Sequence, residues 1–412
     1  RRHRLHRQHL GGVIMAPASD VPTWSREGDL VGVDCSIIRG GTSKGVFVPR
    51  SALPEDEGEL ERFLLALMGS PDPRQIDGLG GADLLTSKVA MIGPPSVDGA
   101  DLDYTFAQVS VAKAQVNMDM NCGNISAAVG IYAIDHGYVK ASSPLTTVRV
   151  HNTNTHKVFV ATVPISQGKP AVEGNCEVDG VPGTGAEIVL DYSETVGTVT
   201  GKLLPTGSVL DQIEVPLVGT ISVSIVDIAN LCVLARASDL GFSPGDIPCA
   251  PSEAQVAKVD SLQRSVARLL GVPEGGLVPI PVLLDHPRSY STVVGDRMVK
   301  REDVDFVAEV IGGQPLVLHK AFPGTASVTV AVAARLPGSV AHQLGNSSDG
   351  QVRIGHPTGR NIVTAQVSSD ETGTPVVMKA AYTRTARKLM EGKAFVQASK
   401  VLTRGNNGDI RA

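Results

Sequence analysis

The sequence predicts an α+β protein built mainly of short strands, and three observations support this prediction. The chain has 412 residues, of which 42% are apolar, enough for a buried core and for two or three domains. Its 44 glycines and 26 prolines, against 8 Phe, 6 Tyr and 1 Trp, indicate many tight turns and a core of Val, Ile, Leu and Ala. Strand-like runs alternate irregularly with a few helical ones, which argues against a doubly wound parallel sheet, a coiled coil or a helical solenoid.

Strands are expected where apolar residues alternate with polar or β-branched ones. Such runs occupy residues 146–165, 185–193, 221–228 and 326–334. The last run, ASVTVAVAA, is strand-like by propensity because Val and Thr favour extended backbone.

Helices are expected in four segments. Residues 58–69 have apolar residues at helical spacing and end in glycine, and residues 125–137 form a small-residue helix closed by glycine. Residues 252–271 open with a serine cap and end in glycine. Residues 378–392, MKAAYTRTARKLMEG, are expected to form an amphipathic C-terminal helix that packs back on the first domain.

Charge and cysteine content limit the classes of partner. The net charge of −5, from 37 basic and 42 acidic residues, gives no basic excess for nucleic acid, and no apolar run is long enough to span a membrane. Five cysteines without a CxxC pair favour free thiols in a reducing compartment, such as the cytoplasm, over disulfides or a zinc site. Residues 1–28 are expected to be a disordered leader; they begin RRHRLHRQH, which leaves import into an organelle open.

Two glycine-rich segments in the first half are candidate anion sites. In RGGTSKG (39–45), Thr42 and Ser43 lie between glycines whose backbone N–H groups are exposed, although a plain hairpin turn fits the pattern equally well. In QIDGLGGADLLTSK (75–88), three glycines precede Lys88, which opens the apolar run VAMI. A lysine buried there suits base chemistry, because desolvation disfavours the ammonium form. A lysine that extends to solvent is the alternative.

Two polar loops precede the small-residue segments of the two halves. The first loop is NCGN (121–124) and the second is PGTAS (323–327). A thiolate at Cys122 would be stabilised by a helix N-terminus, whereas a small buried thiol is the alternative. Two such loops would make a pseudo-symmetric pair of anion sites facing one cleft. HPTG (356–359) presents an imidazole and a hydroxyl on a turn, and His319 and Lys320 would add positive charge.

Taken together, seven segments resemble the PrpF-like isomerases. In chain order they are RGGTSKG, QIDGLGGADLLTSKVA, NCGN, TGKLLPTG, HKAFPGTA, HPTG and TRTARKLMEG, and the resemblance covers about Ile37 to Gly392. It implies the diaminopimelate-epimerase-like fold, in which two similar halves each wrap a curled sheet around a central helix, with the site between them. The halves are then expected at 29–205 and 206–412, and residues 326–334 become a central helix rather than a strand.

The resemblance also implies a reaction. Members of the family use no metal and no organic cofactor, and they move a proton and a C=C bond along a small unsaturated di- or tricarboxylate such as aconitate, 2-methylaconitate or 4-oxalomesaconate. Lys88 matches the family's catalytic lysine, and Cys122 matches a cysteine that serves as an acid or lines the site. The carboxylates would be held by Thr42, Ser43, Ser87, Asn121, Gly123, Asn124, Thr325, Ala326, Ser327, His356 and Thr358.

Two other functions remain open at the level of sequence. An amino-acid racemase or epimerase of the same fold would need a second cysteine, but the matching segment GTASVTVAV contains none, which disfavours two-thiol chemistry. A non-catalytic carboxylate-binding protein is the other candidate. The expected partner is a small polycarboxylate, and the sequence leaves a homodimer open.

Overall fold

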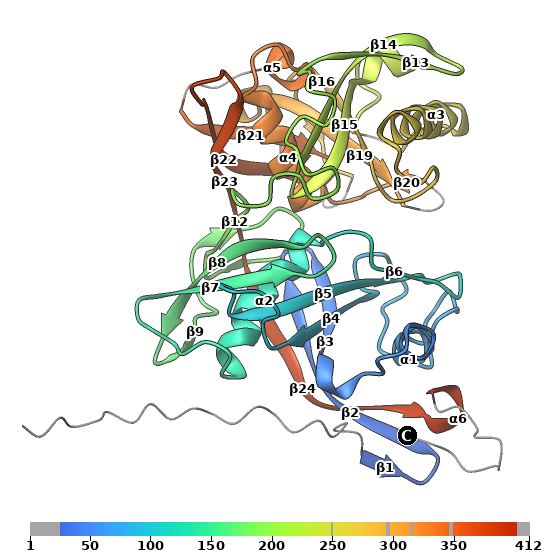
Figure 1. The fold of residues 1–412 in the computed structure, drawn as a ribbon, viewed down its shortest axis with the longest axis vertical. Coiled ribbons are helices and arrows are strands. Elements are labelled where there is room, and N and C mark those ends of the chain that lie inside the picture. The colour runs from blue at the N-terminus through green and yellow to red at the C-terminus, as the bar shows by residue number, and fades with distance from the viewer. Residues whose placement is uncertain (1–24, 249, 294–296, 314–315, 346–348, 402–412) are drawn as a thin grey trace, which may run out of the picture.

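The protein is described here by a computed structural model covering residues 25–401, except 249, 294–296, 314–315 and 346–348. Two halves are stacked along the long axis of the molecule (Figure 1). Most of the expected leader lies outside the described residues, but Ser25–Glu27 form β1, which pairs with β2. Residues 25–27, which fall within the expected leader, are therefore part of the sheet.

The first half is a curled sheet of mixed strands. β2 and β3 form an antiparallel hairpin, β3 lies parallel to β4, β4 and β5 are antiparallel, and β5 lies parallel to β7. β7 and β8 then pair antiparallel, as do β8 and β12. The strands are β2 (Leu30–Gly40), β3 (Ser43–Pro49), β4 (Lys88–Gly93), β5 (Leu102–Val109), β7 (Leu145–Asn152), β8 (Lys157–Ser166) and β12 (Ile188–Asp191).

The second half repeats the same order of pairings, strand for strand. β14 and β15 are antiparallel, β15 lies parallel to β16, β16 and β19 are antiparallel, and β19 lies parallel to β21. β21, β22 and β23 complete the sheet with antiparallel pairings. The strands are β14 (Gly219–Ile228), β15 (Asn230–Arg236), β16 (Ile280–Asp285), β19 (Phe306–Gly312), β21 (Gln351–His356), β22 (Gly359–Ser369) and β23 (Pro375–Arg384).

The two half-sheets join through β12 and β23, which pair antiparallel. A further strand flanks each half: β13 (Asp211–Val215) pairs with β14, and β24 (Ala386–Gln397) crosses to the first half and pairs with β2. The predicted fold of two pseudo-symmetric halves is confirmed. The expected strands in 146–165, 185–193 and 221–228 correspond to β7 and β8, β12, and β14.

Each half encloses one helix, α2 (Gly123–Asp135) in the first and α4 (Gly324–Ala334) in the second. Residues 123–134 of α2 and every residue of α4 are buried, as expected for helices without a polar face. Small residues allow this enclosure: a Cβ on Gly130 would lie 2.8 Å from Val163 Cγ2. The strand expected from propensity at 326–334 is therefore wrong, and the helix implied by the family resemblance is present.

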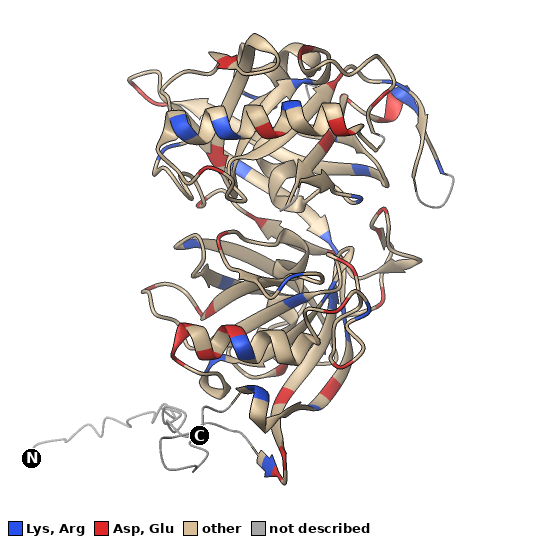
Figure 2. Cartoon of the chain, turned by 90° about the vertical axis from the view of Figure 1, so that its right-hand side faces the viewer, with Lys and Arg blue, Asp and Glu red and all other residues tan. Residues whose placement is uncertain are grey.

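Two amphipathic helices cover the outside of the sheets. α1 (Glu57–Met68) is capped by Asp56, and α3 (Glu253–Leu270) begins with a capping box of Ser252 and Gln255. Both expected helices are confirmed, and both end at a left-handed glycine. Their outward faces carry charged residues of both signs (Figure 2). Two short helices, α5 (Val340–Leu344) and α6 (Ala398–Val401), are also present.

The expected C-terminal helix at 378–392 is wrong. The segment forms the end of β23 and the start of β24, and the chain passes from one half to the other between them. Tyr382 and Arg384 are buried on the same face of β23, whereas Met378 and Leu389 are exposed. Hydrogen bonding to the neighbouring β22 and to β12 and β2, which are distant in sequence, overrides the helical propensity of Ala, Lys, Arg and Leu.

Two properties of the described part of the chain bear on the sequence predictions. None of its helices has the length and apolarity needed to cross a membrane. Cys35, Cys122, Cys176 and Cys232 are free thiols, and no cluster of three or more His, Cys, Asp or Glu side chains suited to a metal occurs among these residues.

Candidate active site

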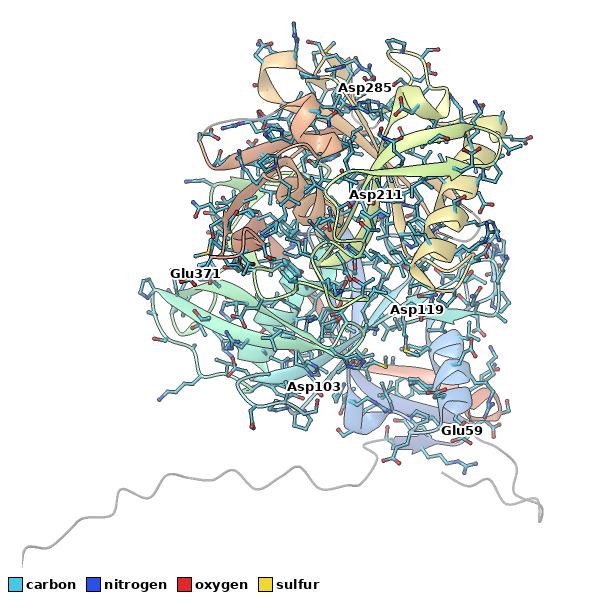
Figure 3. All side chains as sticks on the ribbon, turned by 45° about the horizontal axis from the view of Figure 1, so that its top comes forward. Glu59, Asp103, Asp119, Asp211, Asp285 and Glu371 are labelled. Carbon is cyan, nitrogen blue, oxygen red and sulfur yellow. The ribbon has the colours of Figure 1, made fainter. Side chains whose placement is uncertain are left out.

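A cavity of about 510 Å³ lies between the two halves. It brings together residues from the starts of β3, β4, α2 and α4, which are far apart in sequence. Asp119, labelled in Figure 3, belongs to the segment that leads into α2 on one side of this boundary. Of the predicted site residues, seven line the cavity: Ser43, Lys88, Asn121, Cys122, Gly123, Asn124 and Thr325.

Lys88 is the first residue of β4 and is only 4% exposed. Its Nζ donates a 2.5 Å hydrogen bond to Gln108 Oε1 on β5 and lies 5.1 Å from the centre of the Phe106 ring. The Gln108 amide is itself fixed, because its Nε2 donates to the Ser87 carbonyl at 2.8 Å. Buried amines are held by such partners, so the structure places an oriented nitrogen at the cavity wall.

The second half has no amine at the corresponding position. Lys88 on β4 pairs with Gly45 on β3, and the corresponding pair in the second half is Ile280 on β16 with Cys232 on β15. Ile280 is therefore the counterpart of Lys88. Continuing the register, Gly312 corresponds to Gln108, and both Ile280 and Gly312 line the same cavity. The pseudo-symmetric site therefore has one basic wall and one apolar wall.

The N-termini of α2 and α4 meet at this cavity. A Cβ on Gly123 would lie 3.0 Å from the Thr325 backbone nitrogen and 2.2 Å from Tyr382 Oη, so only glycine fits at this approach. The first-turn N–H groups of a helix have no partner within the helix and carry partial positive charge. Two such termini facing one cavity provide a site for a carboxylate.

Cys122 is the N-cap residue of α2, and its counterpart in the second half is Pro323. The equivalence follows from matching hydrogen bonds: Ser126 N donates to the Cys122 carbonyl and Ser327 N to the Pro323 carbonyl, each at 2.9 Å. Proline carries neither a thiol nor an N–H group. Among the described residues that line the cavity, the thiol therefore lies on one side only.

Two side-chain amides orient hydroxyl groups at the cavity, and two of these hydroxyls, on Ser43 and Thr325, line it. Asn124 Nδ2 donates to Thr42 Oγ1 at 2.9 Å and to Ser43 Oγ at 3.5 Å. On the second half, Asn230 Nδ2 donates to Thr325 Oγ1 at 2.7 Å. Because the Ser43 and Thr325 oxygens accept these bonds, their O–H protons are left to donate to a carboxylate in the cavity.

Six of the predicted site residues are not on this wall: Thr42, Ser87, Ala326, Ser327, His356 and Thr358. Ser87 Oγ accepts from Gln75 Nε2 at 2.7 Å and donates to the Val109 carbonyl at 2.8 Å. His356 Nδ1 accepts from the Thr358 backbone N–H at 3.3 Å, and burial together with the charge of Arg384 lowers the pKa of His356 to about 3. Direct contact of these six residues with substrate stays a prediction.

His319 lines the cavity, but its chemistry differs from the expectation. Burial and the nearby charge of Lys88 lower the pKa of His319 to about 3, so the imidazole is neutral and adds no positive charge. Its Nδ1 is buried and has no hydrogen-bond partner among the described residues. Lys320 is paired with Asp83 of the first half at 3.5 Å. Two further residues belong to the site: Gln108 lines the cavity, and Asn230 bonds to Thr325. No sequence motif predicts them, because only strand register relates them to Lys88 and Thr325.

Comparison with known proteins assigns the family. The family model described as "PrpF protein" matches residues 30–397. The chain belongs to the PrpF family. It is 41% identical to 3-methylitaconate isomerase of Eubacterium barkeri, over 91% of this chain and 100% of that protein. It is 38% identical to (4E)-oxalomesaconate Delta-isomerase of Novosphingobium sp. (strain KA1), over 90% of this chain and 99% of the relative.

Solved structures agree with this assignment. A crystal structure of methylitaconate-delta-isomerase superposes with a TM-score of 0.75 at 40% identity, covering 91% of this chain and 98% of that one. A hydroxyproline epimerase from Agrobacterium vitis shares the fold, with a TM-score of 0.53 at 13% identity over 90% of this chain and 94% of that one. The predicted family and the epimerase-like fold are confirmed.

Proposed function

We propose that this protein is an allylic isomerase that moves a proton and a C=C bond along a small unsaturated di- or tricarboxylate, with no metal or organic cofactor in the reaction. One observation supports this proposal most directly: within the described part of the chain, a single buried lysine lines the same cavity as two helix N-termini. The similarity to named isomerases of methylitaconate and oxalomesaconate points to the same chemistry.

The proposed reaction is a proton shift over three carbon atoms. The Lys88 amine, in its neutral form, takes a proton from the allylic carbon, and the electron pair delocalises through the C=C bond into the adjacent carboxylate. N–H groups at the starts of α2 and α4, with the Ser43 and Thr325 hydroxyls, stabilise the resulting dienolate; one such donor is worth about 3 kcal/mol. A proton returned two carbons away, by the Lys88 ammonium or the Cys122 thiol, completes the isomerisation.

The same geometry opposes two-thiol epimerisation. That mechanism needs a thiol on each side of the substrate, and the position related to Cys122 holds Pro323. A one-base isomerisation needs no second thiol, so the asymmetry between the walls suits it.

Proton NMR in deuterated water tests the proposal directly. We expect one or more of cis-aconitate, trans-aconitate, 2-methylaconitate, 3-methylitaconate and 4-oxalomesaconate to isomerise with deuterium incorporation, and Lys88→Ala to abolish both. Absence of isomerisation and of exchange across the whole panel would refute the proposal. Binding of these acids without exchange would instead indicate a carboxylate-binding protein.

A further inference from the structure

Arg384 is a buried cation that the proposed reaction does not use. It is the last residue of β23, is 5% exposed, and belongs to the TRTARKLMEG segment that the resemblance left without a role. None of the ion pairs within the described residues includes it; its guanidinium instead donates to neutral oxygens. A buried charge without a counter-ion is costly, so its presence calls for a function.

The guanidinium connects the two halves at the helix N-termini. Nε donates to Asn124 Oδ1 at 3.1 Å, and one terminal nitrogen donates to Asn361 Oδ1 at 3.2 Å. Both amides are buried, and each passes the interaction on: Asn124 Nδ2 reaches Thr42 and Ser43, and Asn361 Nδ2 donates to Ser327 Oγ at 2.8 Å. One side chain thus fixes the orientation of an amide on each half.

The pseudo-symmetry shows that the fold itself does not require this charge. Following the strand register, the first-half counterparts of Asn361 and Arg384 are Phe159 and Tyr192. Those two rings stack 5.2 Å apart, so an apolar pair fills the equivalent position in the other half. The polar pair is therefore specific to the side on which the arginine reaches both helices.

The ring of Tyr382 holds the guanidinium in place. The centre of the guanidinium lies 4.5 Å from the ring centre, and Tyr382 Oη packs between Gly123 and Gly324 at the starts of α2 and α4. Burial lowers the pKa of Arg384, but a guanidinium stays charged throughout the working range of proteins. The positive charge is thus permanent and close to both helix termini.

We propose that Arg384 is a positioning residue for carboxylate binding, which aligns the donors of both helix N-termini through Asn124 and Asn361. With each amide oxygen tied to the guanidinium, each NH₂ group must face its hydroxyl partner, and the Ser43 proton is directed to the cavity. Arg384 does not line that cavity and so acts through the amides. This inference rests on the proposed function, because it assumes a carboxylate substrate.

The test uses the full-length chain and two substitutions of Arg384. Arg384→Lys keeps the charge, but a single ammonium cannot span two acceptors in a fixed fork, and Arg384→Met removes the charge as well. Arg387→Gln is the matched control, since Arg387 is an exposed arginine three residues along the chain. The probe is tricarballylate, a saturated tricarboxylate with no C=C bond to move, whose Kd is measured by calorimetry. KM and kcat are measured for whichever acid of the panel isomerises.

We expect both Arg384 variants to raise the Kd of tricarballylate at least about tenfold, with KM rising more than kcat falls, and Arg387→Gln to match wild type. In a double-mutant cycle, adding Asn124→Ala to Arg384→Met should cause little further loss, because both changes break one chain of bonds. Losses that multiply, or an unchanged Kd in a folded Arg384 variant, would overturn the proposal.

Further outcomes distinguish a failure of this proposal from misfolding of the Arg384 variants and from a failure of the proposed function. If neither Arg384 variant folds, Asn124→Ala and Asn361→Ala leave the arginine in place, and wild-type affinity in both would overturn the proposal. Wild-type protein that binds tricarballylate but isomerises nothing refutes the proposed function alone. Wild-type protein that does not bind it refutes the carboxylate site on which both proposals rest.

Discussion

Replacement of Lys88 by methionine tests the assignment of the base most sharply. Methionine keeps an unbranched stem of similar length beside Phe106 but removes the nitrogen that bonds to Gln108. Loss of a general base costs about 10²–10⁴ in rate. Since the Ile280 wall offers no replacement amine, we expect kcat/KM to fall by about 10³-fold or more, roughly 4 kcal/mol of transition-state stabilisation.

The effect on stability should be small by comparison. The substitution leaves Gln108 Oε1 without its donor, costing about 1–3 kcal/mol, but it also removes a polar group from a buried position, where polar groups are costly. Thermal unfolding should therefore show a folded variant, and proton NMR in deuterated water should show slow or absent exchange. Lys157→Met, at the first residue of β8 and away from the cavity, is the control. A folded Lys88→Met protein within tenfold of wild-type kcat/KM would refute the reasoning.

Three further predictions concern the residues around the helix N-termini. If the Cys122 thiol returns the proton, Cys122→Ala should lower kcat by about 10²-fold with a smaller change in KM, as measured by steady-state kinetics. An unchanged kcat would show that the thiol only lines the site. Gly123→Ala should destabilise the protein by about 1–3 kcal/mol in thermal unfolding, because the new Cβ would lie 2.2 Å from Tyr382 Oη, and Tyr382→Phe should restore part of the loss; a fully stable Gly123→Ala protein contradicts this. The unfolded chain protonates His356 below about pH 6.5, whereas the folded protein holds it neutral down to about 3, so its contribution to stability is present at neutral pH and falls by about 2 kcal/mol at pH 5. Urea unfolding at both pH values should show a smaller acid loss for His356→Asn, and an equal loss would count against burial as its cause.

Much of the fold could be predicted from local patterns, where local forces decide. The helices α1 and α3 have caps, glycine stops and one apolar face, and these signals lie within the segments themselves. The segment 378–392 has strong helix formers, but its hydrogen bonds run to strands that lie up to some 350 residues away along the chain, and no local pattern records them. The prediction of a strand at 326–334 is also wrong. Its β-branched residues favour a strand locally, but they are tolerated in a helix that is buried on all sides.

The site was only partly visible in the sequence. Lys88, Cys122 and the polar loops stand in recognisable motifs, and the structure places Lys88, Cys122 and part of each loop around one cavity. Three other residues contribute through side-chain bonds to partners distant in sequence: Gln108 to Lys88, Asn230 to Thr325, and Arg384 to Asn124. No spacing along the chain predicts these bonds. His356 and Thr358 stand out as a motif, yet they bond to each other in a turn; Asn152 and Thr155 make the corresponding turn in the first half.

The return of β24 to β2 ties the order of synthesis to the order of folding. On a ribosome, the first half emerges with the long edge of β2 open on one side, and the strand that covers it is made some 350 residues later. The second half carries its own covering strand, β13, and can close its sheet as soon as it emerges. An open edge of this length is a template for pairing with other chains. Fragments that end before residue 386 lack β24 and should therefore aggregate in expression trials, even though they contain Lys88.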